Sequence, residues 1–334
     1  MSEREDSEPV VHVRREAGVT MFIAVNSTLR GPALGGCRWL PYESEAAAQR
    51  EAEQLAAAMT RKGALADLPL GGGKAVVVGD PQKRSREQLH AFGSFVDSLE
   101  GAYITAEDMG TTPEAMSVIA ERTSHVIGLP VSEGGCGDPS PHTAVGVSLA
   151  IDAALNHVGR SVAGARVAVQ GVGAVGRALV EELLRAGARV TAADPDAARL
   201  ASLPKEVTRV GVEEILSVAC DVLAPCGPPS VLTRESIDRL RCELVCGAAN
   251  NPLAGPEVAT ELDKRGILFV PDFLANAGGL IHLLVAREGG DASDTRERLE
   301  LIPKNFARVM EIARAERVDP LAAAERVIAE RLRS

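Results

Sequence analysis

The stretch VAVQGVGAVG, residues 167–176, joins a short apolar run to a glycine-rich turn. The apolar run is typical of a buried strand, and Gly171, Gly173 and Gly176 follow it in the pattern G-x-G-x-x-G. In this pattern the first glycine permits a tight turn, and the second lets the backbone approach a pyrophosphate. The third lets the following helix pack closely on its strand. The stretch therefore predicts a dinucleotide-binding turn at the start of a helix, whose free N–H groups attract phosphate.

A carboxylate follows this turn at the distance that the interpretation requires. The next apolar run, ARVTAAD at residues 188–194, ends in Asp194, 18 residues after Gly176. A carboxylate at this position accepts hydrogen bonds from both hydroxyls of the adenosine ribose and repels a 2′-phosphate, which favours NAD over NADP. The alternative is a solvated acid in a turn, because Asp-Pro-Asp is itself a turn-like sequence.

Short apolar strands alternate with helical segments from residue 144 onwards, which predicts a parallel, doubly wound sheet of the Rossmann type. The loop SEGGCGDPSPHT, residues 132–143, is rich in Gly, Pro and Ser and is the best linker candidate. We therefore expect an α/β protein of two domains. The predicted parts are a disordered tail (1–9), an α/β substrate-binding and oligomerisation domain (10–134), an NAD-binding Rossmann domain (135–290) and a C-terminal helical segment that returns to the first domain (291–334).

Composition limits the classes of function. The chain has 334 residues with 36 basic and 46 acidic side chains, a formal net charge of −10, and no basic block that would suit nucleic acid. It has no apolar run of about 20 residues, and its acidic start, MSEREDSEP, is unlike a signal peptide, so we expect a cytoplasmic protein without a membrane partner. The cysteine spacings match no zinc pattern, so we expect no metal site and six reduced cysteines: Cys37, Cys136, Cys220, Cys226, Cys242 and Cys246.

A second glycine-rich stretch, LPLGGGKAVVVGDP at residues 68–81, sets Lys74 between three glycines and an apolar run. If the glycines bring the backbone against a ligand, Lys74 lies in a partly dry setting, with Lys62 12 residues earlier as a second cation. Such a lysine is a candidate general base. The alternative is a surface lysine that precedes a strand.

Further motifs occur in a fixed order along nearly the whole chain. They are GPALGGCRW, MTRKGALADLPLGGGKAVV, YITAEDMGTT, GDPSPHTAVGV, VQGVGAVG, CDVLAPC, GAANNPL and PDFLANAGG. As a set, from about residue 10 to about residue 290, they closely resemble the Glu/Leu/Phe/Val family of amino-acid dehydrogenases. The resemblance implies a reversible, NAD-dependent oxidative deamination of an L-amino acid. It also implies a homo-oligomer, a dimer or higher.

The resemblance implies a role for each of three charged residues. Lys74 corresponds to the base that activates water for attack on an imine, and Lys62 to the lysine that pairs with the substrate α-carboxylate. Asp108, in AED-x-GTT, corresponds to the carboxylate that exchanges a proton with the amino group. These roles fit the chemistry, because the amine must lose a proton before hydride leaves Cα, and the product iminium then requires an activated water.

Other positions are implied by the same motifs. Around the substrate we expect Lys62, Leu34, Gly35, Gly36, Ala106, Asn250, Leu280 and Leu283. Around the cofactor we expect Gly171, Gly173, Ala174, Val175, Gly176, Asp194, Thr143, Cys226, Ala248, Asn250 and Asn276. For three of them a structural role is an open alternative: Asn276 and Asn250 can shape turns, and Thr143 can cap the following helix.

The side chain of the substrate is predicted from two positions. Glutamate-specific members of the family hold the side-chain carboxylate with a lysine and a serine, where this chain has Leu34 and Leu283. Two leucines against a buried carboxylate would cost several kcal/mol, so we expect an apolar substrate. The bulk of Leu280 and Leu283 favours valine or leucine, whereas HLLVARE after NAGG is more like the phenylalanine enzymes, and the choice stays open.

Two departures from the family pattern lie near these motifs: Gly63 follows Lys62 where a side chain is usual, and Trp39 ends GGCRW. Neither removes a catalytic group. Two other functions are alternatives. One is a related enzyme that couples a 2-oxo acid to an amine in secondary metabolism, and the other is an NAD-binding regulator without catalysis. The retained Lys62, Lys74 and Asp108 argue against the regulator.

Overall fold

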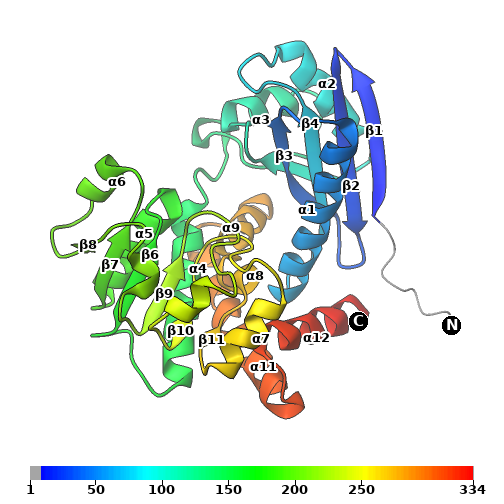
Figure 1. The fold of residues 1–334 in the computed structure, drawn as a ribbon. Helices are drawn as coiled ribbons and strands as arrows, with labels where there is room; N and C mark the ends of the chain where they lie inside the picture. The colour runs from blue at the N-terminus through cyan, green and yellow to red at the C-terminus, as the bar shows by residue number, and fades with distance from the viewer. Residues whose placement is uncertain (1–8, 334) are drawn as a thin grey trace. The chain divides into compact units, whose positions relative to one another are not determined.

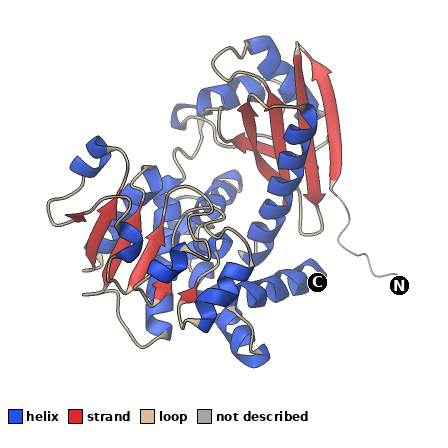
Figure 2. Ribbon diagram, in the orientation of Figure 1, coloured by secondary structure: helices blue, strands red, loops and turns tan. Residues whose placement is uncertain are grey.

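A computed structural model describes residues 9–333 of the chain, and it divides them into two compact units. The first unit comprises residues 9–138 with Ala286–Gly289, and the second comprises Pro139–Val285 with Gly290–Arg333. Both mix helices with a single sheet (Figures 1 and 2), so the predicted two-domain α/β fold is confirmed. The predicted disordered tail lies, apart from Pro9, outside the described residues. No helix within residues 9–333 is long and apolar enough to cross a membrane.

The first unit is built on a five-stranded sheet with the order β1-β2-β4-β3-β5. The pairs β1–β2 and β2–β4 are antiparallel, whereas β3 is parallel to both β4 and β5. Its strands are β1 (Val10–Glu16), β2 (Val19–Ser27), β3 (Ala33–Leu40), β4 (Gly71–Val78) and β5 (Tyr103–Glu107). Its helices are α1 (Glu45–Leu65), α2 (Arg86–Asp97), α3 (Pro113–Ala120) and the short 3-10 turn Val131–Glu133.

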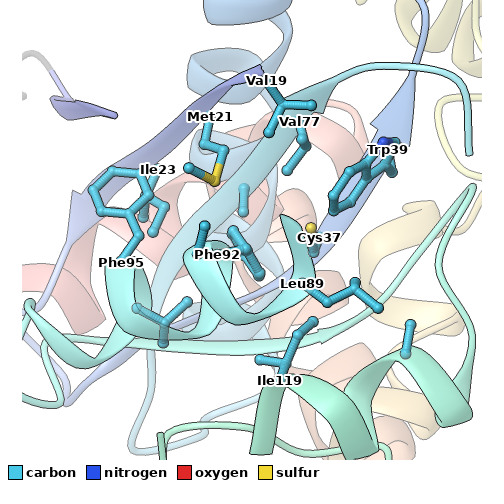
Figure 3. Close-up of a cluster of buried hydrophobic side chains, with 14 of the residues drawn as sticks. Val19, Met21, Ile23, Cys37, Trp39, Val77, Leu89, Phe92, Phe95 and Ile119 are labelled. Atoms are coloured by element: carbon cyan, nitrogen blue, oxygen red, sulfur yellow. The ribbon is translucent and has the colours of Figure 1, made fainter. Parts of the chain in front are cut away.

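Helices cover both faces of this sheet because successive strand side chains point to opposite sides. On one face α1 lies against β2 and β4 and packs with alanines, so that helix and sheet approach closely. The buried residues of this face are Phe22, Ala24, Ala48, Ala52, Ala56 and Val76. On the other face α2 and α3 pack larger side chains on the sheet (Figure 3), among them Met21, Ile23, Trp39, Val77, Leu89, Phe92 and Ile119.

The second unit contains a six-stranded sheet whose described pairs are all parallel. Its strands are β6 (Arg166–Gln170), β7 (Arg189–Ala193), β8 (Thr208–Arg209), β9 (Val222–Pro225), β10 (Leu244–Val245) and β11 (Leu268–Phe269). The spatial order is β8-β7-β6-β9-β10-β11. Counted from β6, this is the order 3-2-1-4-5-6 of the Rossmann fold, the fold that the alternation of strands and helices predicted.

The helices of the second unit are α4 (Ser140–His157), α5 (Ala174–Arg185), α6 (Ala197–Ala201), α7 (Glu257–Lys264), α8 (Asp272–Ala275), α9 (Gly278–Arg287, whose last two residues are grouped with the first unit), α10 (Ala292–Leu299), α11 (Leu301–Glu316) and α12 (Pro320–Arg333). Two 3-10 turns, Ile215–Ser217 and Ser236–Arg239, complete it. We expected residues 291–334 to return to the first domain. This stays a prediction. Within the second unit, α11 packs on α4 and α8, and α12 packs on α11 and β11, where buried residues such as Ile302 and Phe306 extend the core.

Candidate active site

Lys74 lies inside β4, where its side chain is 9% exposed and its Nζ pairs with the carboxylate of Asp108. Because alternate residues of a strand share a face, Lys74 points to the same side as Val76, which is the side covered by α1. A surface position for this lysine, the alternative considered above, is therefore wrong. A buried ammonium is stable only when it is paired, and Asp108 provides the pair.

Gly36 makes this pairing possible, because β3 separates the strands that carry the two partners. The constant register of β3 with β4 places Gly36 beside Lys74, and β3 pairs Gly36 with Ala106 of β5. A Cβ at Gly36 would lie 2.8 Å from the Cβ of Asp108. The strand thus presents bare backbone where the lysine side chain crosses it.

The turn after β5 fixes the position of Asp108. The hydroxyl of Thr111 accepts a hydrogen bond from the backbone N–H of Asp108 at 2.8 Å and donates one to the carbonyl of Cys37 on β3 at 2.9 Å. Gly110 has φ of +81°, and a Cβ there would lie 1.9 Å from the carbonyl oxygen of Trp39. The sequence DMGTT therefore forms a turn that is tied to β3 and holds its first residue in place.

Sequence reasoning missed a second cation at this carboxylate. Arg38 on β3 donates from Nε to Oδ2 of Asp108 at 3.2 Å, and its Nη1 binds Glu51 of α1. Burial alone raises the pKa of Asp108, but the neighbouring Lys74 and Arg38 lower it more, so the pKa lies below the usual value of 3.8. Asp108 is thus an ionised carboxylate at neutral pH. The available signal was strand alternation, since Arg38 shares its face with Gly36.

The three glycines of GGGK have a reason other than the one expected. Gly71, Gly72 and Gly73 are buried strand residues, and the atoms that their side chains would meet belong to the protein. A Cβ at Gly72 would lie 2.1 Å from the backbone nitrogen of Thr60 in α1, and one at Gly73 would lie 2.7 Å from the ring of Tyr103. The glycines therefore permit close packing of the protein on itself, in place of the ligand approach that we predicted.

Lys62 lies in the last turn of α1, where it is half-buried and where a cation is favoured by the helix dipole. Thr60, two residues earlier, is the residue that touches Gly72 of β4. The end of α1 that carries Lys62 is thus packed on the strand that carries Lys74. Gly63, the departure from the family pattern, is buried, and a Cβ there would lie 3.3 Å from the carbonyl oxygen of Leu70.

Four further predicted substrate residues lie on β3 and β5. Leu34 and Ala106 are 2% and 4% exposed, so both are core positions of the first unit. Gly35 is also buried; its carbonyl accepts a hydrogen bond from the hydroxyl of Tyr103 at 2.5 Å, and a Cβ there would lie 1.7 Å from the carbonyl oxygen of Gly73. Together with Gly36 they belong to the adjacent strands β3 and β5, next to the positions of Lys74 and Asp108.

The glycine-rich turn of the second unit lies between β6 and α5 and shows a different environment for each glycine. Gly171 has φ of +91°, which suits a tight turn and which other residues rarely adopt. A Cβ at Gly176 would lie 2.0 Å from the carbonyl oxygen of Gly171, so this glycine permits helix–strand packing. Around Gly173, the N-cap of α5, a Cβ would meet no atom within 4 Å, so the backbone is open to a ligand. Ala174 and Val175 follow as the first helical residues.

Asp194 directly follows β7 and is 8% exposed. Its Oδ2 accepts a hydrogen bond from the N–H of Val172 in the glycine turn at 2.7 Å, and its Oδ1 accepts one from the N–H of Asp196 at 2.8 Å. Asp194 is therefore not a solvated acid, although its bond from Asp196 does close the Asp-Pro-Asp turn that the alternative considered. The carboxylate is built into the turn that follows β6, and each oxygen keeps a further lone pair for a ligand hydroxyl.

Several predicted cofactor residues gather beyond the carboxyl ends of β9 and β10. Asn276 is 6% exposed, and its amide nitrogen donates to Oδ1 of Asn250 at 3.0 Å and to the carbonyl of Ala248 at 3.2 Å. Its own Oδ1 is buried and has no hydrogen-bond partner among the described residues. Thr143 lies next to this turn, because a Cβ at Gly279 would lie 2.6 Å from its hydroxyl.

The remaining predicted residues of the second unit are Cys226, Leu280 and Leu283. Cys226 follows β9 and borders the glycine turn, because a Cβ at Gly176 would lie 3.2 Å from the Cβ of Cys226. Burial raises the pKa of the Cys226 thiol to about 12, so it is a neutral thiol. Leu280 and Leu283 both lie on α9, the former 7% exposed and the latter half-buried. Among the described residues, no group of His, Cys, Asp and Glu side chains suits a metal ion.

Known proteins match both units. Residues 8–125 match the family model of the Glu/Leu/Phe/Val dehydrogenase dimerisation domain, and residues 134–196 and 195–332 match that of the Glutamate/Leucine/Phenylalanine/Valine dehydrogenases. A phenylalanine dehydrogenase of Caldalkalibacillus thermarum is 39% identical, over 94% of this chain and 88% of that protein. A leucine dehydrogenase of Bacillus subtilis is 37% identical, over 99% of this chain and 92% of that protein.

A solved structure gives the same result. The crystal structure of L-tryptophan dehydrogenase from Nostoc punctiforme matches with a TM-score of 0.85 and 34% identity, over 97% of this chain and 95% of that one. The sequence motifs, the Rossmann strand order and these matches agree over nearly the full length. The chain therefore belongs to the Glu/Leu/Phe/Val family of amino-acid dehydrogenases.

Proposed function

We propose that the chain catalyses the reversible, NAD-dependent oxidative deamination of an apolar L-amino acid to the 2-oxo acid and ammonia. The observation that carries the proposal is the buried pair of Lys74 and Asp108 in the first unit of a chain whose second unit has a dinucleotide-binding turn. Burial of an ion pair is costly, and a site where it is retained is a candidate for chemistry.

The first unit supplies the groups that the amino acid requires. Lys62 is the cation for the α-carboxylate. Asp108, ionised because Lys74 and Arg38 lower its pKa, takes a proton from the substrate ammonium, which leaves a neutral amine. After oxidation at Cα, Lys74 is the base that takes a proton from water, and the hydroxide adds to the imine carbon. Asp108 then returns its proton to the amino nitrogen and, ionised again, accepts the proton of the carbinolamine hydroxyl, so that the C=O bond forms as the C–N bond breaks and ammonia leaves.

The residues of the second unit fit NAD. The bound nicotinamide ring supplies the hydride acceptor, and the protein supplies position. The open backbone at Gly173 leaves space for a pyrophosphate at the start of α5. Asp194 accepts hydrogen bonds from the ribose hydroxyls, and its negative charge disfavours a 2′-phosphate. The buried, unpartnered Oδ1 of Asn276 is an acceptor for the carboxamide N–H of the nicotinamide.

An apolar substrate is supported by Leu34 and Leu283, which replace the lysine and serine that hold the glutamate side chain elsewhere in the family. The phenylalanine and leucine dehydrogenases match this chain at 39% and 37% identity, so the comparisons do not rank an aromatic side chain against a branched one. A methylene in an apolar pocket changes affinity by only about 1–3 kcal/mol, so this choice needs measurement.

We also propose a homo-oligomer, a dimer or higher. The support is the match of residues 8–125 to a dimerisation domain. Size-exclusion chromatography with light scattering measures the subunit number directly, and a monomer at all concentrations would contradict this part of the proposal.

The function is tested with a panel of L-amino acids and NAD, scored by NADH absorbance. We expect turnover with valine, leucine or phenylalanine and none with glutamate or aspartate. Activity with glutamate would contradict the apolar assignment. If no amino acid is oxidised but NADH is consumed when a 2-oxo acid and an amine larger than ammonia are supplied together, the chain is a coupling enzyme of the same family.

A further inference from the structure

We propose that Arg38, held in turn by Glu51, is a positioning residue that fixes the rotation of the Asp108 carboxylate for proton exchange with the substrate amine. This inference rests on the proposed function and concerns the same site. Arg38 binds the carboxylates of Asp108 and Glu51, and it acts on the reaction through Asp108.

The backbone places Arg38 and Asp108 side by side although they are 70 residues apart in sequence. The parallel register of β3 with β5 pairs Gly36 with Ala106 and Cys37 with Glu107. The next residue along each strand is Arg38 on β3 and Asp108 after β5, so these two lie side by side. The guanidinium is 17% exposed, and the carboxylate is 20% exposed. The interaction is therefore well shielded from solvent, where hydrogen bonds between charged groups are strongest.

The guanidinium uses two of its edges at once. Nε donates to Oδ2 of Asp108, while Nη1 binds a carboxylate oxygen of Glu51, whose side chain is 31% exposed. Glu51 belongs to α1, which is packed on the sheet through its alanines. Because a guanidinium is planar and its donors are fixed relative to one another, holding one edge on Glu51 sets the direction of the other.

Both cations bind the same oxygen of Asp108. The shortest contacts of Lys74 Nζ and of Arg38 Nε with this carboxylate are both made with Oδ2. A carboxylate that is held by one oxygen from two directions cannot rotate freely about its C–C bond. Oδ1 is then the oxygen available for a proton of the substrate ammonium, and Arg38 keeps it directed away from Lys74.

Three other titratable groups around Asp108 do not change charge in the pH range of the kcat/KM profile. These groups are Cys37 and Tyr103 on the sheet, and Tyr42, which also faces Glu51. Burial raises the pKa of each above its ordinary value, which already lies above neutrality, so all three stay uncharged over the assay range. The charged groups at this carboxylate are therefore Lys74, Arg38 and, behind Arg38, Glu51.

The experiment compares kcat, KM and the acid limb of the kcat/KM–pH profile for wild type and three variants, using the best substrate of the panel. For Arg38→Gln we expect kcat to fall about 10- to 100-fold, since a misplacement of about 1 Å has this effect, with KM changed less than about threefold. The acid limb should move to higher pH, because one of the two cations that lower the pKa of Asp108 is lost.

Arg38→Lys separates charge from geometry. A lysine keeps the positive charge but cannot bind Asp108 and Glu51 through one rigid plane, so we expect the acid limb to stay near the wild-type position while kcat remains low. Glu51→Gln keeps Arg38 and its charge, and we expect a smaller fall in kcat with the limb unmoved. The matched control is Arg30→Gln, which removes another shielded arginine, 19% exposed and paired with Asp67 at 2.7 Å, and should leave the limb in place.

The inference is overturned if the activity of Arg38→Gln falls only in proportion to its thermal stability and its acid limb stays in place, as in the Arg30 control. Arg38 would then be a structural residue. A wild-type enzyme that oxidises no amino acid would contradict the proposed function instead. In that case pH-dependent unfolding tests Arg38. Because the pKa of Asp108 is lowered in the folded state, the stability that Arg38 adds must fade as pH falls below about 4 and must be absent in an Asp108→Asn background.

Discussion

The environments of Gly173 and Gly176 lead to opposite expectations for the same substitution. Gly173 has φ of −65°, an ordinary value for any residue, and a Cβ there meets no protein atom within 4 Å. Alanine at this N-cap position should therefore lower the free energy of unfolding by only about 0.5–1 kcal/mol. The methyl group would instead occupy the space above the start of α5 into which we expect the pyrophosphate to fit.

The expected loss of NAD affinity follows from the hydrogen bonds that a displaced phosphate no longer accepts. A hydrogen bond to a charged group contributes about 1.5–3 kcal/mol. The loss of one such bond from the N-terminus of α5 corresponds to a rise of about 10- to 100-fold in the Kd for NAD. Gly173→Ser should weaken NAD binding to the same extent without the loss of stability, because serine is a good N-cap residue.

Gly176→Ala is the contrasting variant. Its Cβ would lie 2.0 Å from the backbone carbonyl oxygen of Gly171, and the Cβ of Cys226 at 3.2 Å leaves little room to move. We expect a loss of about 1–3 kcal/mol or more in stability. NADH fluorescence titration gives the Kd, and urea unfolding gives the stability of each variant. Unchanged NAD affinity in both Gly173 variants, with intact folding, would refute the assignment of this turn to a pyrophosphate.

Three other predictions concern charged groups. Lys74→Ala should reduce turnover by at least about 100-fold while the Kd for NAD changes less than about threefold, and a variant that keeps its turnover would remove Lys74 from the proposed role. Asp194→Asn keeps an acceptor for the N–H of Val172 but loses the charge, so the preference of kcat/KM for NAD over NADP should fall; an unchanged ratio would place cofactor selection elsewhere. The hydrogen bond that Arg166 donates to Asp221 lowers the pKa of Asp221 from 3.8 to about 2. At pH 7 the ionised Asp221 should therefore stabilise the fold by about 1–2 kcal/mol, after allowance for the exposure of Arg166. In urea unfolding the difference between wild type and Asp221→Asn should therefore fade between pH 4 and pH 2, and a difference that persists at pH 2 would contradict the assignment to ionisation.

The second unit could be predicted in some detail because its decisive features are local in sequence. The turn glycines, the strand before them and the acid after the next strand lie within 28 residues of each other, from Val167 to Asp194. Each glycine role depends on φ or on a neighbour within the same turn, as for Gly171 and Gly176. The engagement of Asp194 with the N–H of Val172 was not predicted, because it depends on how two adjacent strand ends face each other.

The first unit resisted prediction where its features depend on strand order. The sheet places β3 between β4 and β5, and this order decides that Gly36 faces Lys74 and that Arg38 meets Asp108. Arg38 and Asp108 are separated by 70 residues, and a periodic pattern does not encode which strands become neighbours. Apolar alternation could indicate that Arg38 shares a face with Gly36, but the partner on the adjacent strand came only from the fold.

The glycines before Lys74 have a structural reason that differs from the ligand approach predicted for them. They matter for the site because Gly72 admits the backbone of Thr60, which brings the last turns of α1 onto β4. Lys62 lies two residues after this contact, and Glu51 lies earlier on the same helix. A side chain at position 72 would push α1 outward. It would thereby move both Lys62, the proposed partner of the substrate carboxylate, and Glu51, which holds Arg38. The GGGK sequence therefore constrains the site through the helix that it allows to approach, and this constraint applies before any ligand binds.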